Sequence, residues 1–174
     1  ADPSLSTQEY SMTNNDILRR IRFIFNLSDS RMMAIFALAD HKVTREEVSN
    51  LLKKEDDPTY QKCYDTMLAT FLNGFISDKR GKKEGPLPVP EKRLNNNIIL
   101  RKMKIALNLK DEDMLKILEQ ADFRLSKHEV SAFFRKPDHK HYRPCKDQVL
   151  RCLLKGLQIT HRPDVPLKTE FKWK

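Results

Sequence analysis

Residues 14–22 read NNDILRRIR, and residues 96–104 read NNIILRKMK. The similarity continues without a gap at a constant offset of 82 residues, and 23 of the 61 aligned pairs between residues 14–74 and 96–156 are identical. Identity of this extent in one fixed register indicates a tandem duplication. The chain therefore contains two copies of one structural unit, and each feature of one copy can be checked against the other.

Each copy contains four segments in which apolar residues recur at helical spacing, and no segment alternates as a strand would. The first of these helices is predicted at residues 15–27, with Asn14, Asn15 and Asp16 offering their side chains to its free backbone N–H groups. Between the second and third helices a short turn gives each pair the length of a helix-turn-helix. The predicted fold is all-α, with two tandem four-helix repeats, each with a helix-turn-helix-like pair, packed into one globular unit.

Helix boundaries are also marked by polar residues and glycines. Residues 44–47 and 126–129 both fit a capping box, in which a hydroxyl and a glutamate three residues later satisfy each other's backbone N–H groups. We expect Asp65 and Asp147 to be the N-caps of the two fourth helices. Gly74 and Gly156 interrupt otherwise good helical sequence, so they predict a close approach between helices.

The predicted boundaries follow from this repeat and from the composition of the segments around it. Residues 1–13 form an N-terminal segment that is disordered or was added for expression, and residues 14–80 form the first repeat. A linker that contains proline and glycine covers residues 81–95, the second repeat covers 96–158, and 159–174 form a C-terminal tail. Because units of about 60 residues are marginally stable alone, we expect the two repeats to share an interface.

Bulk composition narrows the class of protein. The chain has 174 residues, of which 39% are hydrophobic and 33% are charged. No apolar run approaches the ~20 residues that a membrane helix needs. Three cysteines without a Cys-x-x-Cys motif do not form a disulfide framework. We therefore predict a cytoplasmic protein that has no membrane association, no cofactor and no evident small-molecule substrate.

The positive charge of the chain is concentrated in the second repeat. The formal net charge is +9, yet residues 14–80 carry 11 basic and 10 acidic residues, whereas residues 96–158 carry 14 and 8. Most of the excess positive charge of the second repeat lies in residues 135–146. This segment combines basic side chains that could bind phosphates with aromatic and histidine rings that could stack on bases. The candidate nucleic-acid-binding residues are Arg135, Lys136, His139, Lys140, His141, Arg143 and Lys146, together with Lys127. A solvated loop without a ligand is the alternative interpretation.

Other kinds of site receive less support. If each repeat bound DNA as a helix-turn-helix, its third helix would enter the major groove and contact bases through residues such as Arg45 and Lys127. The turn between the second and third helices, however, lacks the glycine that is usual in this motif. His139, His141, Cys145 and Cys152 match no common zinc spacing, so no metal site is predicted, and Cys63 and Cys145 are interpreted as small buried side chains. No phosphate-binding glycine loop or catalytic motif is present, so no enzyme activity is predicted.

A second hypothesis is a protein-interaction module or homodimer. The second helix of the first repeat is apolar almost all round, with Met33 and Leu38 in addition to its core face. Apolar side chains left uncovered would form a surface for a protein partner. A map of the surface distinguishes this hypothesis from nucleic-acid binding.

Several strings, in order, resemble the YehS-like family of bacterial proteins. They are NNDILR at residues 14–19, FLNGFI at 71–76, KRG at 79–81, NNNI at 95–98 and PDHK at 137–140. The resemblance covers roughly residues 12–160. It implies a duplicated cytoplasmic bacterial protein, and it implies no activity and no functional residue.

Overall fold

The computed structural model describes residues 12–166, and this part of the chain contains eight helices and no strand. The first repeat comprises α2 (Asn14–Ile24), α3 (Asp29–Leu38), α4 (Arg45–Leu51) and α5 (Asp65–Arg80). The second comprises α6 (Asn96–Ala106), α7 (Asp111–Gln120), α8 (Lys127–Ala132) and α9 (Asp147–His161). The predicted all-α fold with tandem repeats is confirmed. Most of the segments predicted to lie outside the fold, residues 1–11 and 167–174, fall outside the described residues.

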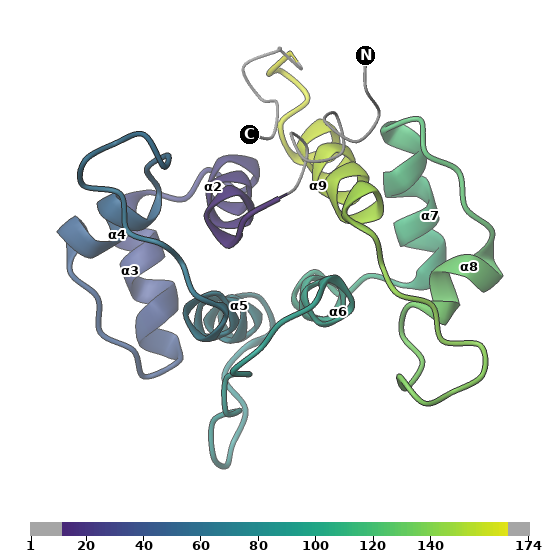
Figure 1. Ribbon diagram of the computed structural model, residues 1–174, viewed down its shortest axis with the longest axis horizontal. Helices are drawn as coiled ribbons and strands as arrows, with labels where there is room; N and C mark the ends of the chain where they lie inside the picture. The colour runs from purple at the N-terminus through teal and green to yellow at the C-terminus, as the bar shows by residue number, and fades with distance from the viewer. Residues whose placement is uncertain (1–11, 167–174) are drawn as a thin grey trace.

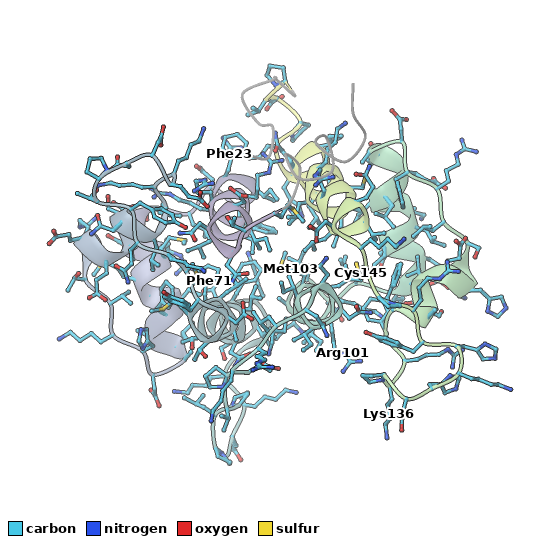
Figure 2. The ribbon with its side chains drawn as sticks, viewed as in Figure 1. Phe23, Phe71, Arg101, Met103, Lys136 and Cys145 are labelled. Carbon is cyan, nitrogen blue, oxygen red and sulfur yellow. The ribbon has the colours of Figure 1, made fainter. Side chains whose placement is uncertain are left out.

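Four helices form the centre of the molecule, and the others flank them (Figure 1). Within each repeat α2 contacts α5 and α6 contacts α9, while α5 contacts α6 and α9 contacts α2 across the repeats. The pair α3 and α4 covers one side, and α7 and α8 cover the other. Phe71 from α5 and Met103 from α6 lie in this centre (Figure 2) and are 0% exposed. The two repeats therefore share one continuous hydrophobic core.

Helices α5 and α6 run in the same direction. Near their first residues the backbone N–H of Leu94 donates to Asp65 at 2.9 Å, and halfway along them Lys102 Nζ donates to Asn73 Oδ1 at 2.7 Å. Consequently the linker returns along the pair, and the C-terminal ends of both helices lie together.

The two repeated glycines lie where helices cross most closely. A Cβ added at Gly74 would lie 2.0 Å from the carbonyl oxygen of Ile35, and one added at Gly156 would lie 2.0 Å from that of Ile117. No side chain fits at these distances, so α5 packs on α3, and α9 on α7, through backbone contact. The prediction of close helix approach is confirmed in both repeats.

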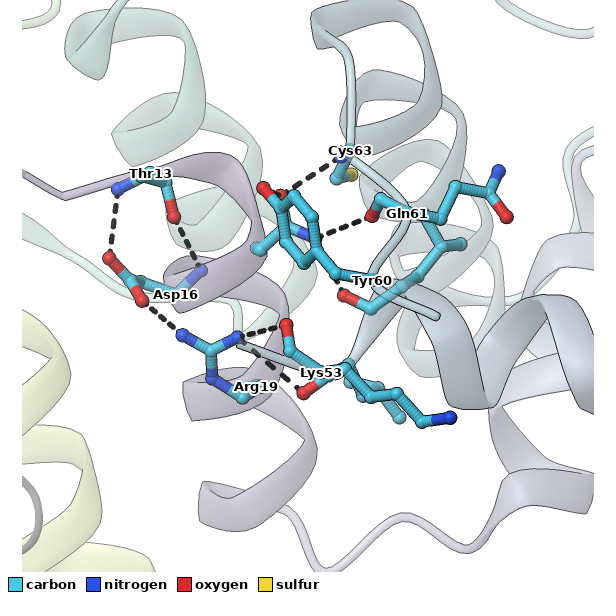
Figure 3. A network of polar contacts seen from close by, with 10 residues as sticks. Thr13, Asp16, Arg19, Lys53, Tyr60, Gln61 and Cys63 are labelled. Carbon is cyan, nitrogen blue, oxygen red and sulfur yellow. Dashed lines mark hydrogen bonds and ion pairs between the residues drawn. The ribbon is translucent and has the colours of Figure 1, made fainter. Parts of the chain in front are cut away.

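Polar side chains define the helix starts, although not always those predicted. The capping boxes at residues 44–47 and 126–129 are confirmed. Helix α2 begins one residue earlier than predicted, because Thr13 and Asp16 form a capping box of their own (Figure 3). It ends at Ile24, before the left-handed turn at Asn26. Asp65 and Asp147 are not N-caps; they are the first residues of α5 and α9, and their carboxylates accept hydrogen bonds from the neighbouring helix start.

Four turn residues adopt left-handed backbone conformations, which explains why they recur. Asn26 and Asn108 have φ of 52° and 53°, and Asp40 and Asp122 both have φ of 56°. Asparagine and aspartate tolerate this region better than other residues with a Cβ. The same short turns therefore follow the first two helices of each repeat. Beyond them, α9 continues to His161, past residue 158 at which the second repeat was predicted to end.

Candidate nucleic-acid interface

Each repeat holds the loop after its third helix with one buried asparagine. We call residues 53–64 the first loop and residues 135–146 the second loop. Asn15 Nδ2 donates to the carbonyl oxygens of Leu51 and Gln61 at 2.8 and 2.9 Å, and its Oδ1 accepts from the N–H of Cys63 at 2.9 Å. Asn97 makes the three equivalent bonds at 3.0, 2.9 and 2.8 Å. Both ends of each loop are thus fixed to the first helix of its repeat.

The preceding asparagine connects the end of each loop to the next helix. Asn14 Nδ2 donates to the carbonyl oxygen of Cys63 at 3.0 Å and to Asp65 at 2.7 Å, and Asn96 repeats both bonds at the same lengths. Asp16 caps the first helix as predicted, but Asn14 and Asn15 bond the loop instead, as Asn96 and Asn97 do in the second repeat. These asparagines set the positions at which the two loops emerge.

The buried cysteines take part in this frame through their backbone groups, and their thiols are inert. Cys63 is 1% exposed and Cys145 is 5% exposed, which confirms the prediction of small buried side chains. Burial, with a smaller contribution from a nearby aspartate, raises the thiol pKa of each to about 12. A thiol with such a pKa stays protonated near neutral pH.

The two loops differ strongly in charge although their frames match. The first loop contains three basic and three acidic residues, whereas the second contains five basic residues, one aspartate and two histidines. Arg135, Lys136, Lys140 and Lys146 form no ion pair with any described residue. All four are exposed except Arg135, which is half-buried. The second loop therefore presents a local positive potential that the first loop lacks.

Other predicted residues are engaged within the protein. Arg143 forms an ion pair with Glu129 at 3.3 Å. The rings of His139 and His141 are exposed and lie 5.5 Å apart, and His139 Nδ1 accepts from the backbone N–H of His141. Lys127 lies on α8 rather than on the second loop and pairs with Glu112 at 2.6 Å. The structure thus brings together the loop residues and leaves Lys127 beside α7.

The geometry gives no support to groove reading by α4 or α8. These helices have only seven and six residues, shorter than two turns. Arg45 forms an ion pair with Asp29 and donates to Ser30, and Ser131 donates to Asp111. Arg45 and Lys127, the two residues named above for groove reading, are therefore engaged with the preceding helix of their repeat.

The tyrosines of the two loops differ in their anchoring. Tyr60 donates its hydroxyl hydrogen bond to Asn15 Oδ1 at 3.0 Å. Tyr142 is half-buried, and its hydroxyl forms no hydrogen bond to the part of the chain that is described. Tyr142 occupies the position equivalent to Tyr60, but it does not form the hydrogen bond that Tyr60 makes to its asparagine.

The surface offers little for the apolar alternative. Met33 and Leu38 are half-buried, and Met33 packs against the core. The large exposed apolar side chains among residues 12–166 are Tyr64, Val89 and Ile105. Within the same range no three His, Cys, Asp or Glu residues are grouped to hold a metal ion. No described helix is long and apolar enough to cross a membrane.

Sequence reasoning missed a second group of cations, which includes Arg101. In the first repeat Arg19 forms an ion pair with Asp16 and also bonds the carbonyl oxygens of Leu52 and Lys53 (Figure 3). Its counterpart Arg101 bonds only the carbonyl oxygen of Phe134, because Ile98 replaces the aspartate. That replacement was the signal available in the sequence. Arg101 and Lys136 lie near the same edge of the molecule (Figure 2).

Comparisons with known proteins place the duplicated frame in a family. A family described as proteins of unknown function, DUF1456, matches residues 14–81 and again residues 96–162. The chain belongs to this family. It is also 46% identical over 147 residues to the uncharacterised protein YehS of Escherichia coli strain K12, which covers 84% of this chain and 94% of that protein. No solved structure matches. The resemblance to YehS-like proteins is thereby confirmed.

Proposed function

We propose that this member of the DUF1456 family binds single-stranded nucleic acid through the second loop. We further propose that it does so in the cytoplasm and acts by binding, not by catalysis. The observation that carries the proposal is the contrast between two loops on one frame. In the second loop four cations without an ion-pair partner among the described residues lie beside one aspartate, whereas in the first loop three such lysines lie beside three acidic residues.

Phosphate binding is supported by the state of these cations. A side chain already held in an ion pair must break that pair to bind a phosphate, whereas Lys136, Lys140 and Lys146 are exposed and make no such pair. Each phosphate they neutralise would release condensed counterions, which makes binding favourable and salt-dependent. Four of the five cations of the second loop are therefore available to a ligand.

A single strand suits this loop better than a duplex. His139 and His141 expose two rings beside the lysines, and unstacked bases bind to such rings. The short α4 and α8 helices, turned toward α3 and α7, leave no helix to enter a major groove. Cations for the backbone and rings for the bases are the usual combination in proteins that bind single strands.

The test is a salt titration with a labelled single strand of about 20 mixed nucleotides, in DNA and RNA form, and with a duplex of the same sequence. The key variant is Lys136→Gln, Lys140→Gln, Lys146→Gln. Its control, Lys53→Gln, Lys54→Gln, Lys62→Gln, changes the net charge equally on the first loop. We expect the key variant to lose about tenfold in affinity, and its plot of log affinity against log salt to flatten by about 2.

The control should bind like the parent protein. Equal losses in both variants would mean that only the total charge matters, and that result would contradict the proposal. So would a parent protein that binds no strand at low salt. Stronger binding to the duplex would overturn the choice of a single strand.

A further inference from the structure

A pocket lies where the C-terminal ends of α5 and α6 meet Phe134. Its volume is about 460 Å³, within the range of small-molecule sites. Ile76 and Arg80 come from α5, and Lys83 from the linker that follows. The second repeat supplies residues from α6, from the turn after it and from the segment after α8: Arg101, Lys104, Ile105, Asn108, Leu109 and Phe134. Both repeats and the linker thus contribute to one cavity.

The pocket is strongly cationic. Arg80 and Lys83 form no ion pair with a described residue, and Arg101 bonds only a backbone carbonyl. Lys104 alone is paired, with Asp111 at 2.9 Å, and its ammonium lies 4.2 Å from the centre of the Phe134 ring. Basic residues near helix C-termini partly offset the helix dipoles, but this effect is worth a fraction of a full charge. Three guanidinium or ammonium groups therefore remain available to an anion.

At the equivalent place in the other half of the molecule an arginine of the protein itself lies against an aromatic ring. Arg162, the counterpart of Arg80, lies over the Phe23 ring at 4.8 Å and donates to the carbonyl oxygen of Phe23 at 2.7 Å. In the second repeat Ile105 replaces Phe23, so the ring that seats Arg162 is missing for Arg80. The same architecture thus holds an internal arginine on one side and leaves an open cationic pocket on the other.

One wall of the pocket is apolar. Ile76, Leu109 and Phe134 are half-buried, and Ile105 is 46% exposed, which is unusual for so large an apolar side chain in this protein. Asn108, held in a left-handed turn at φ 53°, offers an amide at the rim. A ligand that fills this pocket should combine a flat, mainly apolar group with hydrogen-bonding edges and an anionic group.

We propose that the pocket binds a nucleoside phosphate, with the base against Ile105, Leu109 and Phe134 and the phosphate near Arg80, Lys83 and Arg101. The site goes beyond the proposed function, because it would hold a mononucleotide whether or not the second loop binds a strand. Since Phe134 directly precedes the second loop, the nucleotide could equally be one unit of a bound strand. A free nucleotide and a nucleotide within a strand share the same chemistry.

The experiment uses the whole chain and measures binding of the four nucleoside monophosphates, the matching nucleosides and inorganic phosphate, by calorimetry and by nuclear magnetic resonance. Arg80→Gln with Arg101→Gln removes two pocket cations, and Ile105→Glu places a carboxylate against the apolar wall. The control pair, Arg93→Gln with Arg124→Gln, removes two exposed cations outside the pocket. A strand of about 8 nucleotides is titrated in parallel.

We expect at least one monophosphate to saturate the parent and to bind about tenfold more weakly to both pocket variants, with the control unchanged. Nucleoside and phosphate alone should each bind more weakly than the nucleotide. If only the strand binds and the pocket variants weaken it, the nucleotide is held as part of a strand. The inference would be overturned by saturation with neither nucleotide nor strand, or by equal affinity for phosphate and nucleotide. Pocket variants that bind like the parent would also overturn it. The variants that test the second loop leave the pocket intact, so the two proposals can fail separately.

Discussion

The first and second loops are held by equivalent asparagines but differ in charge: the first is balanced and the second is strongly positive. Apart from the hydroxyl of Tyr60, which donates to Asn15, the partners of Asn15 and Asn97 are backbone groups at the loop ends, such as the carbonyl oxygens of Gln61 and Arg143. Backbone groups are present whatever the side chain is, so the frame does not restrict the charge of the loop. The two copies therefore keep the loops in equivalent positions while the charge of their surfaces differs. It also separates residues that shape both repeats from residues that distinguish them.

The largest loss of stability should follow substitution of the two repeated glycines, and the loss should be similar in both repeats. Gly74→Ala and Gly156→Ala would each place a Cβ 2.0 Å from a carbonyl oxygen of the facing helix. The helices must separate, so each change should lower the free energy of unfolding by about 3 kcal/mol, despite the better helix propensity of alanine. Chemical denaturation measures both, with Thr66→Ala on exposed α5 surface as the control. A tolerated alanine in either repeat would show that the backbone contact is looser than described.

The asparagines should show the next largest effect, together with a small asymmetry. Asn15→Ala and Asn97→Ala would leave two carbonyl oxygens and one N–H without their partner. We expect a loss of about 2 to 3 kcal/mol in each. Asn15→Ala should be the more costly, because Tyr60 also loses its acceptor. The measurement is urea unfolding beside Asn50→Ala, and identical costs would remove Tyr60 from the frame of the first loop.

Alkaline pH should destabilise both repeats in the same way. Burial raises the thiol pKa of Cys63 and Cys145 from an ordinary 9.0 to about 12, so the folded protein binds more protons than the unfolded chain between these values. Stability from this source is complete below pH 9.0 and is lost as the pH rises toward about 12. At about pH 10 the loss should be about 1 kcal/mol per thiol.

Thermal unfolding between about pH 8 and pH 10 tests this prediction. The variant Cys63→Ala with Cys145→Ala should lose most of the pH dependence, although its stability at neutral pH will be lower because each change leaves a small cavity. An unchanged pH dependence in this double variant would show that other groups are responsible.

The sequence revealed the fold because a duplication provides its own control. Helical periodicity and capping boxes recurred at one offset, and Gly74 with Gly156 marked the close crossings. The roles of Asn15 and Asp65 could not be predicted in the same way. Their partners lie up to 48 and 51 residues away, so a local helix cap was the nearest explanation for both. Tertiary hydrogen bonds replaced the local ones.

The candidate site was only partly predictable for the same reason. The charge of the second loop is local, so it could be read from residues 135–146. The pairing of Lys127 with Glu112 and of Arg143 with Glu129 depends on packing between helices. The pocket is lined by residues of both repeats, so neither repeat alone predicts it. Ile98 stands where the first repeat has Asp16, and the structure shows the consequence: Arg101 lacks the ion pair that Arg19 forms with Asp16.

The most direct measurement is hydrogen exchange of the whole chain with and without a bound single strand. The two loops occupy equivalent places on equivalent frames, so each serves as the reference for the other in one sample. If the second loop binds the strand, amide exchange should slow in residues 135–146 and should not change in residues 53–64. Equal protection of both loops, or protection that avoids residues 135–146, would contradict binding through the second loop.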